Sequence, residues 1–319
     1  MSDLYLNPIF IPEEIEKERG VIIEEINMYE DTPMRRVHEL FTGLLYGDQP
    51  AGWDIAGSKE VIRELKRDQF QTYREKHYVA SKTVVVVAGS FEEKKVLGQI
   101  KETFGHLKKL PAPKKLKTTE KQSKPEFSIK FKESDQSHLV LGVRSFEVFD
   151  KRRHTLQVLG NVLGGGMSSR LFRKVRDDLG AAYYVKADSD LTLDHGYMSV
   201  AAGVDHLKIE IVIKAILEEM SRLTKELVPD VELQKSKDHL IGNFILGLEG
   251  SDDLASYYGG QEIITKKTKE PEEVIKNVKA VKSEEIRAVA KTLFVDRGLN
   301  LAVIGPYKNS DNFKKILKF

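Results

Sequence analysis

Two stretches of the chain share the same order of hydrophobic and polar positions. In each, a proline opens an amphipathic run: PEEIEKERGVIIEEI begins at Pro12, and PDVELQKSKDHLIGNF begins at Pro229. Proline followed by acidic residues is typical of the first turn of a helix. Further along, VVVVAG ends at Gly89 and LAVIG ends at Gly305, and each predicts a buried strand followed by an amphipathic helix. The two proline-to-glycine spacings are nearly equal, so the pattern predicts two copies of one domain.

A polar segment separates the two copies. Residues 110–126, LPAPKKLKTTEKQSKPE, are rich in proline and lysine and poor in large apolar side chains. This composition is typical of a linker. We therefore expect one domain over residues 1–109 and a second over residues 127–319. Both mix helical and strand patterns, so the predicted fold class is α+β, with a mainly antiparallel sheet covered by helices in each domain.

The copies differ in what precedes the proline. Only 11 residues precede Pro12, whereas the stretch from residue 127 to Pro229 is far longer. The first copy has no counterpart of that stretch, so we expect a first domain that is truncated at its N-terminus. The longer stretch predicts strands at 127–131 and 137–143, helices at 154–163 and 168–178, and a strand pair at 181–188 and 196–203.

Two carboxylates interrupt the apolar pattern of the first helix. At about 100° per residue, Glu18 and Glu25 project between hydrophobic residues on both sides. An ionised carboxylate that faces a core is costly unless it is paired or binds a metal. The second copy has Ser236 and Asn243 at the equivalent positions, so the helix does not require acids there. The pattern indicates a metal or catalytic site, and two solvated acids at a helix edge are the alternative.

Composition narrows the possible function classes. The 319 residues contain no cysteine, which excludes disulfides, thiolate nucleophiles and cysteine-ligated metals. With 51 basic and 49 acidic residues, the net charge of +2 excludes a strongly cationic polyanion binder. No apolar run approaches the ~20 residues that span a bilayer, and no signal peptide is visible. We expect a cytoplasmic protein that binds neither nucleic acid nor membrane.

Two further motifs favour simple interpretations. Gly164, Gly165 and Gly166 could suggest a phosphate loop, but no Gly-Lys-Ser/Thr comes after them, so a tight turn before a helix is favoured. The basic run KKLPAPKKLK at 108–117 has no interleaved aromatic residues and is typical of a solvated linker.

Longer motifs carry a family resemblance. NPIFIPEEIEKERGVIIEEINMYED, HELFTGLLYGDQPAGWDIAGS and LGGGMSSRLFRKVRDDLGAAYYV resemble the inverted zinc metallopeptidases of the insulinase, pitrilysin and mitochondrial processing peptidase family. The resemblance covers essentially the whole chain. It implies a zinc-dependent endopeptidase that cleaves peptides or unfolded segments inside an enclosed chamber.

The resemblance also assigns roles to the two carboxylates. In this family, two histidines of an H-x-x-E-H helix and a downstream glutamate hold zinc, and the motif's own glutamate is the general base. The pattern implies that Glu25 is the third zinc ligand and that Glu18 supports it without binding the ion directly. The sequence contains no H-x-x-E-H, and one glutamate cannot hold zinc at useful affinity. We therefore expect the chain as given to be inactive.

The second half resembles the substrate-handling portion of the family. There, an arginine and a tyrosine seven residues apart contact the bound peptide or polarise its scissile carbonyl, a pattern that Arg176 and Tyr183 match. The alternative is a surface arginine and a packed strand tyrosine. The resemblance further implies a homodimer or a pair of family subunits. The rival class is a non-catalytic scaffold or partner subunit of such a peptidase.

Overall fold

The computed structural model describes residues 2–309 and 311–319 of the chain. The chain divides into two compact units, and segments far apart in the sequence contribute to each. Among the described residues, no helix is both long and apolar enough to cross a membrane. Unit 1 comprises Met1–Met28, Ile55–Leu116 and Leu246–Lys269, and unit 2 comprises Tyr29–Asp54, Lys117–Ile245 and Glu270–Phe319.

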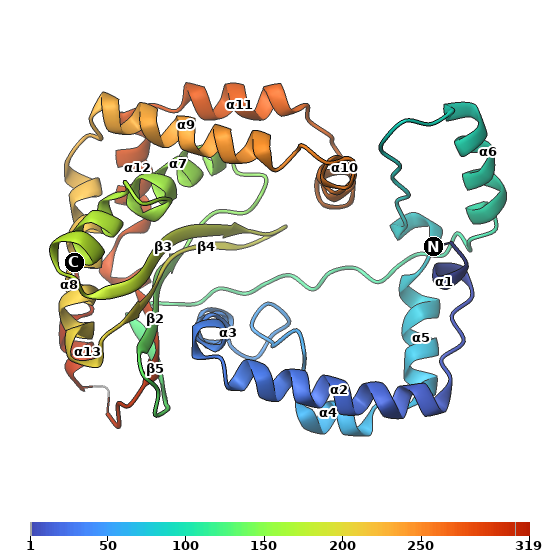
Figure 1. Ribbon diagram of the computed structural model, residues 1–319, viewed down its shortest axis with the longest axis horizontal. Helices are drawn as coiled ribbons and strands as arrows, with labels where there is room; N and C mark the ends of the chain where they lie inside the picture. The colour runs from blue at the N-terminus through green and yellow to red at the C-terminus, as the bar shows by residue number, and fades with distance from the viewer. Residues whose placement is uncertain (1, 310) are drawn as a thin grey trace. The chain divides into compact units, whose positions relative to one another are not determined.

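Unit 2 is built around one mixed sheet of five strands (Figure 1). The spatial order is β1-β5-β2-β4-β3; β1 runs parallel to β5, and the other three pairs are antiparallel. The predicted α+β class is therefore confirmed, and antiparallel pairing predominates in this sheet. The strand bounds are β1 (Glu126–Phe131), β2 (Ser137–Arg144), β3 (Ala182–Leu191), β4 (Gly196–Val204) and β5 (Asn300–Gly305).

The two faces of this sheet enter different cores, because alternate strand residues point to opposite sides. Leu139 and Leu141 of β2 enter the larger core, whereas Val140 enters a smaller one with Phe41. One helix, α3 (Pro33–Tyr46), covers the smaller core. The helices that contribute to the larger core are α7 (Arg153–Gly164), α8 (Ile209–Lys225), α9 (Asp230–Leu246), α11 (Pro271–Ala280), α12 (Ser283–Leu293) and α13 (Asp311–Ile316).

Every strand and helix predicted between residues 127 and 229 is present in unit 2. One of them has an unexpected geometry: the helix expected at 168–178 contains the π-helix η2 (Phe172–Asp178). A π-helix widens the turn by one residue and is frequent at functional sites. Two single turns of 3₁₀-helix complete the unit, η3 (His206–Lys208) and η4 (Asp296–Gly298).

Unit 1 is largely helical and has little buried apolar surface. Of its described hydrophobic side chains, only Ile26 and Val79 are buried. Backbone carbonyls near the N-terminus accept hydrogen bonds from the helix α5, including 2.8 Å from Arg67 Nε to Phe10 O. The elements are α1 (Ser2–Leu6), α2 (Pro12–Glu30, of which the last two residues belong to unit 2), α4 (Lys59–Glu64), α5 (Arg67–His77), η1 (Ala80–Lys82), α6 (Glu93–Phe104) and α10 (Ser251–Thr265).

The strand predicted to end at Gly89 does not form. Residues 83–88 have no strand assignment, and Val85, Val86 and Val87 are 39%, 38% and 44% exposed. A strand needs a neighbouring strand to pair its backbone groups, and the described part of unit 1 contains none. The prediction of a sheet in the first domain is therefore wrong for this segment.

The segment predicted as a linker is irregular at its start and bonded to unit 2 at its end. Residues 110–117 have no regular secondary structure, and most of them are exposed. From Thr118 onward the chain is bonded to unit 2. The Thr118 amide donates to Asp194 Oδ2 at 2.9 Å, and the Thr119 amide donates to Gln49 Oε1 at 2.9 Å. The end of the predicted linker is therefore part of unit 2.

Candidate functional site

The helix α2 carries the two carboxylates that the sequence singles out. Glu18 and Glu25 are both exposed, and Val21 beside them is 50% exposed. The side that packs inward is the one on which Ile22 and the buried Ile26 lie. Glu18 and Glu25 therefore stand at the edge of the buried stripe, and the prediction that they are embedded in it is wrong. The prediction counted Val21 as part of the apolar stripe. Because Val21 is in fact exposed, the true stripe is narrower and leaves Glu18 and Glu25 at its edge.

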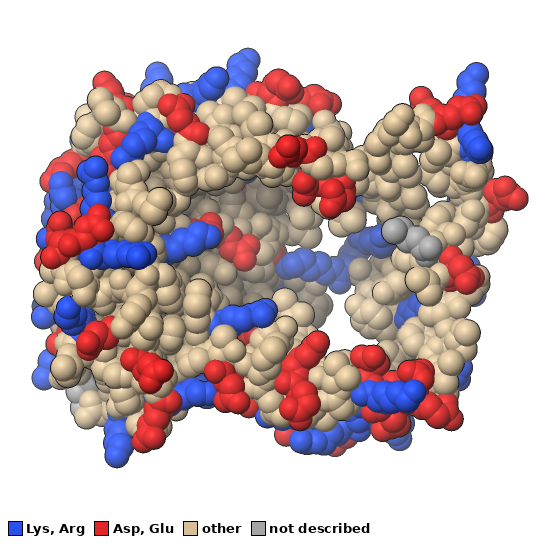
Figure 2. Space-filling model, viewed as in Figure 1, with Lys and Arg blue, Asp and Glu red and all other residues tan. Residues whose placement is uncertain are grey.

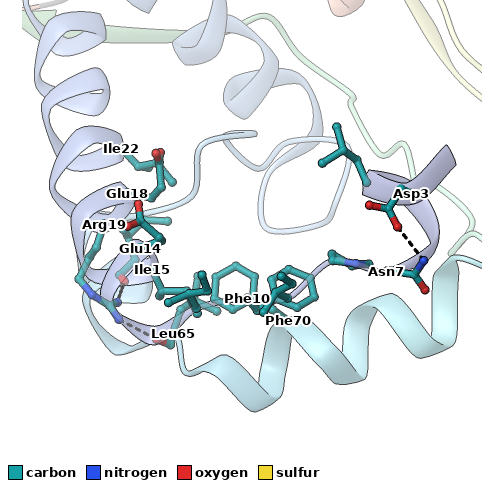
Figure 3. Close-up of a pocket in the computed structure, with 15 residues that line it drawn as sticks. Asp3, Asn7, Phe10, Glu14, Ile15, Glu18, Arg19, Ile22, Leu65 and Phe70 are labelled. Atoms are coloured by element: carbon teal, nitrogen blue, oxygen red, sulfur yellow. Dashed lines mark hydrogen bonds between the residues drawn. The ribbon is translucent and has the colours of Figure 1, made fainter. Parts of the chain in front are cut away.

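Glu18 nevertheless borders a cavity within unit 1. The cavity has a volume of about 670 Å³, and its lining is mostly apolar. Figure 3 shows Glu18 beside Ile22 at one end of the lining, with the rings of Phe10 and Phe70 further along. The two rings stack with their centroids 5.9 Å apart. Glu18 is thus one of three carboxylates, with Asp3 and Glu14, that line this mostly apolar cavity.

A zinc ion does not fit the donors that this structure brings together. No group of three or more His, Cys, Asp or Glu side chains that could hold a metal exists among residues 2–309 and 311–319. Glu18 and Glu25 are seven residues apart, about 10.5 Å along a helix axis, so one ion cannot bind both directly. A zinc site needs about three protein ligands. The described residues alone thus offer at most one.

Arg176 lies on the π-helix η2 in unit 2. Its side chain is exposed, and its guanidinium carbon lies 5.0 Å from the centroid of the Phe172 ring. The widened hydrogen bonding is visible at the end of the element, where the Leu179 amide donates to Lys174 O at 3.2 Å. Buried Val175 fixes the opposite side of η2 against the core. The helix η2 therefore exposes the Arg176 guanidinium to solvent on one side, while its other side packs against the core.

Tyr183 occupies a second irregular position close by in the chain. Ala182 pairs with Val204 and Tyr184 pairs with Gly203, so Tyr183 is the extra residue of a β-bulge in β3. Its ring is 66% exposed. Bulges bend a strand and redirect a side chain, and they are common next to active sites. Because η2 packs against β3, the structure brings the elements that carry Arg176 and Tyr183 into contact.

The neighbouring Tyr184 holds this bulge in place. Its ring covers Gly203, where an added Cβ atom would lie 2.4 Å from Tyr184 Cε1. The Tyr184 hydroxyl lies 3.0 Å from Nδ1 of His138. Burial raises the pKa of Tyr184 to about 12, so the phenol stays protonated at neutral pH. Burial also lowers the pKa of His138, and the nearby His206 adds to that effect. At neutral pH the hydrogen-bonded pair next to the bulge, Tyr184 and His138, is therefore uncharged.

The glycine run at residues 164–166 allows close packing and forms a turn, which agrees with the tight turn predicted from sequence. A Cβ atom on Gly164 would lie 2.4 Å from the Ala187 amide nitrogen, and one on Gly165 would lie 1.9 Å from Asn161 Oδ1. The Ser169 amide and hydroxyl both bond Gly166 O and close the turn. The glycines are therefore explained by close contacts with neighbouring elements.

Sequence reasoning missed a buried charge network beside η2. Arg170, just before η2, donates to both carboxylate oxygens of Glu232 at 2.8 and 2.9 Å. The buried Glu219 of α8 approaches Arg170 Nη1 to 3.9 Å and accepts a 2.9 Å hydrogen bond from Arg222. Glu219 stands in the apolar pattern of α8, between Ile216 and Met220. The projection that flagged Glu18 and Glu25 would have found it.

Charge elsewhere on the surface is mixed. Figure 2 shows acidic and basic side chains interspersed over the visible face, without one extended patch of a single sign. The +2 net charge of the sequence agrees with this distribution.

Comparison with known proteins identifies the family. A model described as the peptidase M16 inactive domain matches residues 64–240. The chain is 33% identical over 313 residues to an uncharacterized zinc protease of Bacillus subtilis named YmxG, covering 97% of this chain and 75% of that protein. An uncharacterized zinc protease of Mycobacterium leprae is 30% identical and is matched over 100% of this chain and 72% of its own length.

The chain belongs to the M16 peptidase family. The family resemblance of the sequence motifs is thereby confirmed. Solved structures agree on the fold. A protease from Helicobacter pylori has a TM-score of 0.84 at 22% identity, covering 92% of this chain and 72% of that one. A peptidase M16 inactive domain from Pseudomonas fluorescens has a TM-score of 0.88 at 17% identity, covering 96% and 73%.

Proposed function

We propose that this M16 chain is the peptide-handling part of a zinc endopeptidase, with Arg176 and Tyr183 as its contacts to the substrate. One observation carries the proposal. The two residues sit on the π-helix and the β-bulge, two departures from regular geometry that pack against each other and are firmly supported from behind. Irregular elements of these two kinds are frequent at functional sites.

The chemistry of the pair suits a peptide carbonyl. Arg176 offers a permanent positive charge with several N–H donors, and Tyr183 offers a phenolic O–H. Both could donate to the oxygen of a bound peptide bond. As the carbonyl carbon becomes tetrahedral, negative charge grows on that oxygen, and aligned donors stabilise it more than they stabilise the ground state. In this proposal the pair orients the substrate and lowers the barrier, but does not supply the attacking water.

Binding of an unfolded peptide tests these assignments directly. A fluorescently labelled peptide of about 25 residues is titrated with the purified chain, and anisotropy gives the Kd. We expect Arg176→Ala and Tyr183→Phe each to weaken binding by about tenfold, the scale of one lost charge-assisted or neutral hydrogen bond. Arg173→Ala is the matched control, because Arg173 is also exposed on η2. Equal affinities for all four proteins would contradict the proposal.

For the carboxylates we propose that Glu25 is one ligand of a zinc ion whose other ligands lie outside these 319 residues, with Glu18 as its supporting acid. The support is the family membership, the names of the zinc protease relatives and the surface position of both acids. The absence of H-x-x-E-H from the sequence implies that the chain alone does not hydrolyse peptides. The single-chain zinc affinity should accordingly be weak.

Complementation separates this enzyme proposal from its rival, a non-catalytic scaffold or partner subunit. The matched model is described as an inactive domain, which favours the rival. The chain is co-expressed with the part of the Bacillus subtilis relative that it does not cover, and peptide hydrolysis is measured with added zinc. We expect activity that is lost in Glu25→Gln and kept in Glu24→Gln, a change at the adjacent exposed acid. Activity that is unchanged in Glu25→Gln would refute the ligand role.

The assembly and the compartment complete the proposal. We propose that two family subunits act together, most simply as a homodimer, since one sequence holds both the acid pair and the Arg176–Tyr183 pair. Light scattering coupled to gel filtration measures the mass of the particle. The lack of cysteine favours a reducing compartment such as the cytoplasm.

A further inference from the structure

Arg170, Glu219 and Glu232 form a charge network just before η2 in the chain, and this network is called the clamp below. The Arg170 side chain is only 11% exposed, and its guanidinium meets carboxylates from two different helices, Glu219 on α8 and Glu232 on α9. The contact with Glu232 is bidentate, at 2.8 and 2.9 Å. Arg222 of the same helix donates to Glu219 Oε1 at 2.9 Å, whereas Arg170 Nη1 lies 3.9 Å from Glu219 Oε2, and neither of these two atoms has a hydrogen-bond partner among the described residues. Buried ions persist only when such partners compensate for lost hydration.

The clamp lies directly before the π-helix in the chain. Arg170 stands two residues before η2 and six residues before Arg176. A π-helix is rare, and its i→i−5 hydrogen bonds give it a register that differs from that of an α-helix. At the far end, the Ala181 amide donates to Val175 O at 3.0 Å, and Gly180 adopts a positive φ of 51°. At the near end, Arg170 bonds Glu232 of α9 and lies 3.9 Å from Glu219 of α8, and Leu171 is fully buried.

We infer that Arg170 is a positioning residue for peptide binding: held by Glu232 and Glu219, it fixes the register of η2 and thereby the direction of Arg176. The inference rests on the proposed function, because it assumes that Arg176 contacts the peptide. The Arg170 side chain is only 11% exposed, and the inference assigns it no contact of its own with the peptide. Its planar fork is what the site requires, because a lysine can supply the charge but not two parallel hydrogen bonds.

Arg170→Lys tests the inference while keeping the buried charge. Unfolding monitored by the emission of Trp53, the only tryptophan and a member of unit 2, first shows that the variant is folded at the assay temperature. We expect the Kd for the labelled peptide to rise by about tenfold, as small misplacements of a binding group commonly cause. Arg173→Lys is the control on η2 itself. A clamp with a purely structural role would lower the unfolding midpoint and leave the Kd of the folded protein unchanged.

A double-mutant cycle with Arg176→Ala decides whether Arg170 acts through Arg176. If it does, Arg170→Lys has no further effect on the Kd once Arg176 is gone, so the two changes are not additive. Additive losses would overturn the inference. If Arg176→Ala alone leaves the Kd unchanged while Arg170→Lys raises it, then the proposed function of Arg176 has failed instead. Should Arg170→Lys not fold, Glu232→Gln removes the same bidentate contact from the other side, and the same cycle applies.

Discussion

Two apolar segments that both have the sequence pattern of a buried strand adopt different structures in this molecule. Residues 301–305 belong to β5, whose side chains are at most 1% exposed from Leu301 to Ile304. Residues 84–88 carry an equally apolar run, yet they pair with no strand, and three of their valines are about two-fifths exposed. The difference lies in the partners. β5 has β1 on one side and β2 on the other, and unit 1 has no described strand to offer.

The comparison teaches that a buried-strand pattern shows that a segment can form a strand, but not that it does form one. Hydrogen bonds of a strand are made with other segments, so the pattern alone cannot ensure them. The surroundings differ in the same way. Both faces of β5 meet hydrophobic cores, whereas unit 1 buries only Ile26 and Val79 among its described hydrophobic residues. Four experiments test that contrast, beginning with the largest expected effect.

Amide hydrogen exchange should separate the two segments most clearly. The amides of β5 exchange only through global opening of unit 2, whereas those of residues 84–88 have no ladder to protect them. We expect the Val303 amide to be protected at least about 10⁴-fold more than the Val85 amide. Exchange at single-residue resolution measures both in one sample. Comparable protection would mean that residues 84–88 are paired in solution.

A charge introduced into each segment should have very different costs. Val303→Asp places a carboxylate in a core position that is 0% exposed, and we expect unit 2 to lose about 4 kcal/mol or more of unfolding free energy. Val85→Asp changes an exposed position, and we expect a loss below about 0.5 kcal/mol. Urea unfolding monitored by Trp53 emission reports unit 2, and far-ultraviolet circular dichroism reports both units. A large loss from Val85→Asp would show a hidden packing role.

Two glycine-to-alanine changes should differ in sign. In unit 2, a Cβ on Gly203 would strike the Tyr184 ring, so we expect Gly203→Ala to destabilise by about 1–3 kcal/mol. In unit 1, nothing lies within 4 Å of a Cβ on Gly98, inside α6, so Gly98→Ala should stabilise by about 0.5–1 kcal/mol. Thermal unfolding of both variants checks the signs. Because the bulge depends on Tyr184, peptide binding should also weaken in Gly203→Ala only.

The smallest effect should be a pH dependence confined to unit 2. Burial lowers the pKa of His138, so the unfolded chain takes up a proton at a higher pH than the folded one. The stability contribution is present above about pH 6.5, the ordinary histidine value, and is lost as the pH falls below it. The ring is only half buried, so solvent screening should keep the loss below about 0.5 kcal/mol. Burial lowers the pKa of His38 in the same unit too, so urea midpoints at pH 7.5 and 5.5 measure both contributions, and His138→Gln should remove only its own part.

Most of unit 2 could be predicted from sequence because its signals are local. Alternation marked the strands, helical periodicity marked α7 and α9, and the tight turn at the glycine run came from residue types. The π-helix could not be predicted, since an extra residue in one turn leaves the apolar spacing almost unchanged. The bulge at Tyr183 was equally hidden, because it depends on the register of β4 against β3.

The candidate site shows a similar division. The family resemblance singled out Arg176 and Tyr183 as candidates, but it did not reveal the irregular elements that present them. Glu18 and Glu25 were found by a projection that one exposed valine distorted, while Glu219, a truly buried acid on an apolar stripe, was overlooked. The lesson is physical: a buried carboxylate needs compensating cations, and for Glu219 these are Arg222 of its own helix and Arg170, which a tertiary contact brings to 3.9 Å.

The placement of β5 has a consequence for synthesis. This strand lies between β1 and β2, although about 155 residues of chain separate it from β2. On a ribosome, therefore, β1 and β2 emerge long before the strand that joins them, and their inner edges stay open in the meantime. The nascent chain must keep those edges from pairing wrongly until β5 has been synthesised. The sheet of unit 2 therefore cannot be completed before β5 has left the ribosome.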